Sequence, residues 1–179
     1  MKRKGIIIGI IAVMFVVWLS FVIQVNAKFP KAVTTIYEKG ETAILDGIQY
    51  EIIDCIWLDA VDVKSYMGDA DSIYDSDYKA MVITLQITNA SQTTADYSLY
   101  ECCVEGAGYT NGLCGELAAN LSDGMMLSGE LEPGETRIVQ MPYMCVESMF
   151  APSVWSQVEN QDFSLVVSLY PEKNALLVQ

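Results

Sequence analysis

Six aspartates crowd into residues 59–77 and form the group of side chains best suited to chemistry in this sequence. Four of them, spaced two or four positions apart, make up the candidate metal set: Asp69, Asp71, Asp75 and Asp77. Carboxylates at this spacing in a loop can converge on a hard cation such as calcium. The pattern departs from an EF-hand, because the sixth position counted from Asp69 is Tyr74 and the twelfth is Ala80. We interpret these residues as a solvated acidic loop, with a calcium site as the alternative.

Five cysteines are the second chemically versatile group: Cys55, Cys102, Cys103, Cys114 and Cys145. If the domain is exported, this odd number leaves at least one thiol unpaired or bonded to another chain. Cys102 and Cys103 are neighbours in a predicted strand, so their side chains face opposite sides. We favour a disulfide from one of them to Cys114, with Cys103–Cys114 as the chosen pair. The alternative is that the cysteines pack as small buried hydrophobes.

The composition argues against catalysis and against nucleic-acid binding. The chain has no histidine, and its 23 acidic and 10 basic residues give a net charge of −13. Without histidine there is no Ser-His or Cys-His catalysis, and phosphate binding needs a basic face that this chain cannot assemble. P-loop, GxSxG and dinucleotide-binding motifs are also missing. We expect no enzyme activity and no cofactor other than the candidate calcium ion.

The amino terminus carries a membrane signal. A basic tail at residues 1–4 precedes 21 uncharged residues from Gly5 to Val25, enough to cross a hydrocarbon core of about 30 Å. We predict an uncleaved transmembrane anchor, because this stretch is longer than a signal-peptide core. A secreted domain cleaved after Ala27 is the alternative. In both cases the basic flank predicts that the rest lies outside the cytoplasm, as the extracytoplasmic part of a single-pass cell-membrane protein.

The remaining chain is predicted to consist of a juxtamembrane linker at residues 26–37 and one domain at residues 38–179. Asp46-Gly47 predicts a type I′ hairpin turn, and Pro133-Gly134 predicts a type II turn. Residues 97–104 are predicted to form one further strand.

Three longer predicted strands alternate apolar and polar residues with a period of two. Their predicted inward residues are Ile48, Tyr50, Ile52, Ile56 and Leu58 in the first, Met81, Ile83, Leu85 and Ile87 in the second, and Phe163, Leu165, Val167 and Leu169 in the third. About seven short strands with few helices favour an all-β fold, an immunoglobulin-like antiparallel β-sandwich.

Several short segments carry a family resemblance. They are Lys39-Gly40-Glu41-Thr42, Ile48-Gln49-Tyr50-Glu51-Ile52, the strand from Met81 to Asn89, Tyr97-Ser98-Leu99-Tyr100 with Gly108-Tyr109, and Leu131-Glu132-Pro133-Gly134-Glu135-Thr136. Their order resembles the telokin-like, immunoglobulin-like extracytoplasmic domains of many Gram-positive membrane-anchored proteins and lipoproteins of unknown function. The resemblance covers roughly residues 38–170 and implies a sandwich fold and an exported location, with no catalytic residues. The acidic insertion, the number of cysteines and the absence of a lipobox cysteine depart from that family.

We therefore expect a membrane-anchored binding or accessory module at a bacterial cell envelope, with an unknown ligand or protein partner. Binding is expected at loops or at an exposed strand edge, with residues 59–77 and 106–115 as candidate surfaces. The alternative is a structural subunit that associates with a membrane transporter or envelope complex. Gly5 and Gly9 form a G-x-x-x-G pair suited to helix contacts.

Overall fold

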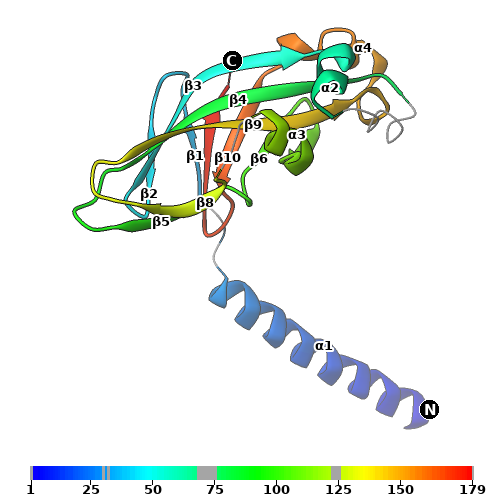
Figure 1. Cartoon of the computed structure of the whole chain (residues 1–179). Helices are drawn as coiled ribbons and strands as arrows, with labels where there is room; N and C mark the ends of the chain where they lie inside the picture. Colours follow the sequence, from blue (N-terminus) through cyan, green and yellow to red (C-terminus); the bar gives the residue numbers. More distant parts are fainter. Residues whose placement is uncertain (1, 30, 32, 68–75, 122–125, 179) are drawn as a thin grey trace.

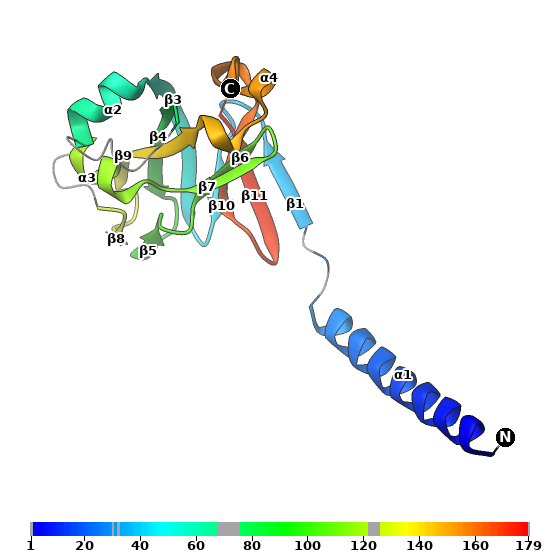
Figure 2. The same ribbon diagram turned by 90° about the vertical axis from the view of Figure 1, so that its right-hand side faces the viewer.

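The computed structural model describes residues 2–29, 31, 33–67, 76–121 and 126–178. The first helix, α1 (Lys2–Lys28), extends away from a folded unit that consists mainly of β-sheet, as Figure 1 and Figure 2 show. Other helical elements are short: α2 (Ala60–Met67), α3 (Gly115–Leu121), α4 (Pro152–Trp155) and the 3₁₀ turns η2 (Glu147–Met149) and η3 (Val158–Asn160).

Eleven strands are formed by the described residues: β1 (Val33–Tyr37), β2 (Ala43–Leu45), β3 (Ile48–Leu58), β4 (Tyr78–Asn89), β5 (Ala95–Ser98), β6 (Cys103–Gly106), β7 (Tyr109–Gly112), β8 (Ser128–Leu131), β9 (Thr136–Val146), β10 (Phe163–Ser168) and β11 (Glu172–Leu177). One sheet has the order β1-β11-β10-β6-β7, a second has the order β2-β3-β4-β9, and β5 pairs with β8. Among these strands only β1 and β11 pair in parallel. The predicted all-β sandwich after an apolar helix is confirmed, with eleven strands rather than about seven.

β4 lies at the centre of the hydrophobic core between the two large sheets. All four residues predicted to face inward on this strand are fully buried: Met81, Ile83, Leu85 and Ile87. Val104 of β6 and Leu165 of β10 belong to the same core cluster and come from the opposite sheet. Since each such side chain contributes roughly 1.5–3 kcal/mol on burial, this contact between the sheets is the main source of stability.

β3 contains a β-bulge that changes which of its side chains face the core. Ile52 and Asp54 pair with consecutive residues of β4, so Ile53 is the extra residue. A bulge inserts one residue and reverses the alternation beyond it. As a result Cys55 and Trp57 pack against the core after the bulge.

The bulge explains why the predicted inward face of β3 was correct only in its first half. Ile56 is exposed and Leu58 packs against a different cluster, so the prediction for these two residues was wrong. In β10 the first predicted inward residues are buried and Val167 packs against the core. Leu169 lies beyond the end of that strand and is exposed.

Both predicted turns have the expected backbone conformation. Asp46 and Gly47 have φ values of 49° and 83°, the pair of positive angles that a type I′ turn requires. Gly134 has a φ of 78°, and the N–H of Glu135 donates to the carbonyl of Glu132 at 2.8 Å. This geometry is that of a type II turn.

Two segments differ from the sequence prediction. Residues 33–37, expected in a linker, form β1, whose residues pair along their whole length with β11. Of residues 97–104, expected as one strand, 97–98 belong to β5 and 103–104 belong to β6, which join different sheets. The chain turns between them, where the N–H of Cys102 donates to the carbonyl of Leu99 at 3.2 Å.

The acidic insertion begins with a helix, α2, that was not predicted from the sequence. Asp59 caps α2, because its Oδ1 accepts the N–H groups of Val61 at 2.8 Å and Asp62 at 2.9 Å. Val63 of α2 and Leu117 of α3 are buried with residues from the outer face of β4 and β9. We call this group the second cluster: Val63, Tyr78, Ala80, Leu117, Met144 and Val146.

Gly106 marks a place where two segments approach too closely for a side chain. A Cβ there would overlap the carbonyl oxygen of Asp162 and lie 2.7 Å from Cδ1 of Phe163. We expect Gly106→Ala to lower the free energy of unfolding by about 2 kcal/mol, the typical cost of overpacking. Urea unfolding measures this change. Gly112→Ala is the matched control, since nothing lies within 4 Å of its added Cβ; equal effects of both variants would contradict the prediction.

Candidate functional site

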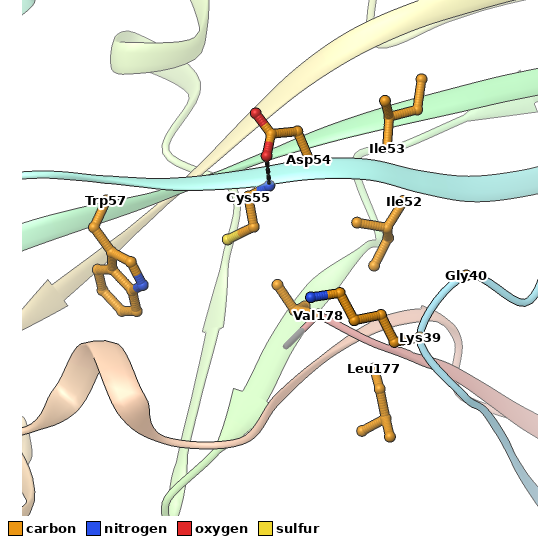
Figure 3. A pocket seen from close by; sticks show the side chains of 9 residues that line it. All are labelled: Lys39, Gly40, Ile52, Ile53, Asp54, Cys55, Trp57, Leu177 and Val178. Carbon is orange, nitrogen blue, oxygen red and sulfur yellow. Dashed lines mark hydrogen bonds between the residues drawn. The ribbon is translucent and has the colours of Figure 1, made fainter.

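A pocket of about 380 Å³ lies between the bulge of β3, the turn after β1 and the end of β11. Its volume is within the usual range of small-molecule sites. The residues that line it are Lys39, Gly40, Ile52, Ile53, Asp54, Cys55, Trp57, Leu177 and Val178. Figure 3 shows that the side chains of Cys55 and Lys39 point into the space beside Val178.

The bulge is the local feature that builds this pocket. It turns Cys55 and Trp57 towards the inside of the sandwich. Asp54 stabilises the bend, because its Oδ1 accepts the N–H of Cys55 at 2.9 Å. Its carboxylate points away from the pocket in Figure 3. Bulges commonly re-aim side chains beside binding sites.

Several of the side chains that line the pocket are apolar, and one part of the wall is held rigidly. Trp57 packs edge-on against Phe163, with ring centroids 5.9 Å apart and planes at 60°. Val178 is buried, and its N–H donates to the carbonyl of Phe163 at 2.9 Å. Lys39 is the one basic residue among those that line the pocket. The pocket therefore combines several apolar side chains with one cation, Lys39, and one acidic residue, Asp54.

A second hollow of about 430 Å³ lies at the opposite end of the sandwich, between the β2–β3 turn and the β10–β11 turn. Three acidic residues line it, Asp46, Asp96 and Glu101. Carboxylates of one sign repel anionic ligands. Among the described residues no group of three or more cysteines or carboxylates has a metal-binding arrangement. The three acidic residues of this hollow therefore do not form a metal site in the structure.

The predicted calcium set lies largely outside the described residues. Asp69, Asp71 and Asp75 fall there, and only Asp77 is described. The Oδ1 atom of Asp77 accepts the N–H of Tyr78 at 2.9 Å, and its carbonyl accepts the N–H of Glu147 at 2.8 Å. These contacts fix the start of β4. The calcium site stays a prediction.

Cys103 and Cys114 lie in different surroundings and are both free thiols in the structure. Burial and the neighbouring Glu105 raise the pKa of Cys103, while Lys173 opposes the shift. Cys114 packs against the second cluster. Cys102 is buried in the core and Cys103 is only partly buried, but Cys102 precedes β6, so the two are not neighbours in one strand as predicted. The disulfide stays a prediction.

The residues of the pocket were not predicted from the sequence. Lys39 and Val178 come from opposite ends of the domain and meet only because β1 pairs with β11. The interruption of the β3 pattern at Asp54 was the available signal, because a polar residue that breaks a period of two is typical of a bulge. The interruption at Asp54 indicates where the strand bends, but it does not indicate that Lys39 and Val178 lie on the other side of the pocket.

The fold and the pocket define an all-β sandwich domain that follows an apolar helix. The chain belongs to the family described as "Domain of unknown function (DUF5028)", whose model matches residues 34–174. No curated protein matches the chain by sequence.

Solved structures share the fold. A putative lipoprotein, ycdA, from Bacillus subtilis is 7% identical with a TM-score of 0.50; the match covers 77% of this chain and 38% of that protein. A hypothetical protein from Bacillus anthracis is 11% identical with a TM-score of 0.50, and the match covers 80% of this chain and 95% of that one. The chain thus spans well under half the length of the lipoprotein. These likenesses show the fold alone, and the narrower telokin-like resemblance stays a prediction.

Residues 5–28 of α1 are long and apolar enough to cross a membrane, with a mean hydropathy of 3.0. Membrane anchors and signal sequences share this property. The helix is therefore compatible with an anchor, and its side chains are exposed in the single chain.

Proposed function

We propose that this protein is a membrane-anchored, extracytoplasmic binding module that holds a small anionic ligand with an apolar body in the pocket beside β3. The observation that carries the proposal is the convergence of Lys39, Cys55 and Trp57 in a pocket of suitable volume. The apolar helix, with its basic flank, supports the anchor. The likeness to a protein described as a putative lipoprotein agrees with a place at the envelope.

The charge of the pocket decides the class of ligand. The chain as a whole is strongly acidic, but charges farther than about 8 Å are largely screened at physiological salt. Lys39 is the one cation among the residues that line the pocket, and the carboxylate of Asp54, which also belongs to the lining, points away from it in Figure 3. The apolar side chains of Ile52, Trp57 and Val178 in the lining favour a hydrocarbon or aromatic body. A monocarboxylate with a short alkyl chain has both features.

Titration with octanoate tests this function. We expect amide shifts of the full chain in detergent micelles to change at Gly40 and Cys55 and at the indole of Trp57. Lys39→Gln should weaken binding at least fivefold, because it removes the cation and leaves an uncharged polar side chain that is only slightly shorter. Lys31→Gln, outside the pocket, is the control and should leave the affinity unchanged. Shifts located elsewhere, or equal affinity of the Lys39→Gln variant, would contradict the proposal.

The alternative function is that of a subunit in a membrane complex. The surface of α1 at Gly5 and Gly9 is open, since nothing lies within 4 Å of a Cβ added at either residue. Small residues four positions apart allow close helix packing in a membrane. Crosslinking in intact membranes distinguishes the two functions, because a subunit gives a stoichiometric partner and a free-standing binding module does not.

A further inference from the structure

The connection between the anchor and the domain is short. Only residues 29–32 separate Lys28, at the end of α1, from Val33, at the start of β1. At no more than about 3.6 Å per residue, Val33 lies within about 18 Å of the end of the helix. The headgroup layer on each side of a bilayer is about 5–8 Å thick. The first residue of β1 is therefore held close to the membrane surface.

The pairing of β1 with β11 brings a second segment to the same level. Val33 pairs with Glu172, and its N–H donates to the carbonyl of Pro171 at 3.2 Å. Figure 2 shows the turn between β10 and β11 beside the start of β1, on the side of the domain from which α1 extends. The β10–β11 turn therefore lies at the end of the sandwich that is closest to the helix.

The tip of this turn is apolar, although turns usually carry Gly, Asn, Asp or Ser. Leu169 is 56% exposed and Tyr170 is 53% exposed. Phe29 and Val33, from the connection and from β1, are exposed as well. Tyrosine is favoured at the boundary between lipid and water, where its ring is apolar and its hydroxyl stays hydrated. We call these four residues the apolar tip.

We propose that the apolar tip inserts into the interface of the membrane that α1 spans, so that the domain lies against the bilayer. This inference rests on the proposed function, because it requires α1 to remain as an anchor. The hollow beside the tip is lined by Asp46 and Glu172, which repel anionic headgroups. Insertion is therefore driven by apolar burial rather than by charge, and zwitterionic lipid is sufficient for it.

Methyl NMR of the full chain in phosphatidylcholine nanodiscs tests the insertion. A small fraction of lipid carries a gadolinium chelate on its headgroup and broadens nearby methyl signals. We expect the methyls of Leu169 to lose at least half of their intensity. The methyl of Met149, which is 59% exposed and lies beyond the far end of β9, should keep most of its intensity and serves as the internal control. Equal intensities of Leu169 and Met149 would overturn the proposal.

Ile23 in α1 separates failure of the anchor from failure of the docking. If its methyl is not broadened, the helix is not in the bilayer and the proposed anchor is wrong. If Ile23 is broadened and Leu169 is not, only the docking is wrong.

A variant of Leu169 tests whether apolar burial, rather than charge, keeps the domain against the membrane. Ile44 is an exposed residue that lines the hollow beside the tip, so docking of the unmodified chain should broaden its methyl signals. Leu169→Asp should restore the intensity of these signals, because it removes an apolar contact with the membrane from an exposed position. Unchanged broadening of Ile44 in this variant argues against insertion. Stronger broadening of Leu169 after addition of the anionic lipid phosphatidylglycerol would also overturn the proposed apolar insertion, because that result indicates electrostatic binding through Lys28 and Lys31.

Discussion

Replacement of Asn89 by alanine is expected to lower the free energy of unfolding by about 3 kcal/mol, since buried polar groups that lose their partners cost about 1–3 kcal/mol each. Asn89 is fully buried at the end of β4. Its Nδ2 donates to the carbonyls of Leu131 at 2.7 Å and Thr93 at 2.8 Å. Its Oδ1 accepts the N–H of Ser91 at 2.9 Å and the hydroxyl of the same residue at 2.7 Å.

The backbone of Asn89 adds to this network. Its N–H donates to the carbonyl of Glu135 at 3.0 Å, and its carbonyl accepts the N–H of Gly134 at 2.9 Å. One residue therefore holds the end of β4, the loop to β5, the end of β8 and the turn before β9. Alanine keeps the two backbone bonds and removes all four side-chain bonds, so the variant isolates the contribution of the amide group.

Urea unfolding of the full chain in detergent, followed by near-ultraviolet circular dichroism, measures the effect. Asn89→Asp should also destabilise the domain, because aspartate cannot donate to the two carbonyls and adds a buried charge. Asn120→Ala is the matched control. The side chain of Asn120 makes one exposed bond to the carbonyl of Glu116, and its loss should cost less than about 0.5 kcal/mol. A cost below about 1 kcal/mol for Asn89→Ala would show that water replaces the amide.

Features that depend on neighbouring residues were predictable from the sequence. The Asp46-Gly47 turn and the inward face of β4 follow from local backbone preference and from alternation, and the structure has both. The helix α2 was also encoded locally, by the cap at Asp59. It was missed because the run of aspartates that follows is typical of a solvated loop.

Features that depend on distant contacts were not predictable. β1 is short and largely exposed, so its sequence gives little sign of a strand; its pairing with β11 joins the two ends of the domain. The candidate pocket depends on that pairing, because it brings Lys39 next to Leu177 and Val178. The bulge at Ile53 then decides that Cys55 and Trp57, rather than their neighbours, complete the lining. No local sequence pattern predicts the β1–β11 pairing, the position of Lys39 beside the end of β11 and the effect of the bulge together.

The stability of the domain is expected to fall steeply above about pH 9, because buried thiols resist ionisation. Burial, with the neighbouring Cys103 and Glu101, raises the pKa of Cys102 from 9.0 to about 12. Burial, with the neighbouring Cys55, raises the pKa of Cys145 to about 12. Both side chains lie in the core cluster.

The direction follows from the protons bound in each state. Below pH 9 both thiols keep their protons whether the chain is folded or unfolded, so stability does not depend on them. Between pH 9 and 12 the unfolded chain releases these protons and the folded chain keeps them, so the free energy of unfolding decreases as the pH rises. Together the two thiols lower the free energy of unfolding by about 3 kcal/mol for each unit of pH in this range. Above pH 12 the slope from the thiols disappears.

Two buried tyrosines act in the same direction. Burial, with the neighbouring Cys102, raises the pKa of Tyr50 to about 12 and raises the pKa of Tyr143 as well. The hydroxyl of Tyr143 is fully buried and has no hydrogen-bond partner among the described residues, so nothing in that part of the chain stabilises its phenolate. Their titration extends the loss of stability to the upper part of the pH range.

Urea unfolding at pH values from 7 to 11, with reductant present, measures this slope. The Cys102→Ala, Cys145→Ala double variant removes both thiols, and it should be less stable at pH 7 because of the lost packing. Its stability should nevertheless depend less on pH between 9 and 10 than that of the unmodified chain, because the thiols no longer titrate. Cys103→Ala is the comparison variant: because Cys103 is only partly buried, its removal should reduce the slope by less than the double variant does. Parallel pH profiles for the double variant and the unmodified chain would mean that the core thiols already ionise in the folded state at the pH at which unfolded thiols do.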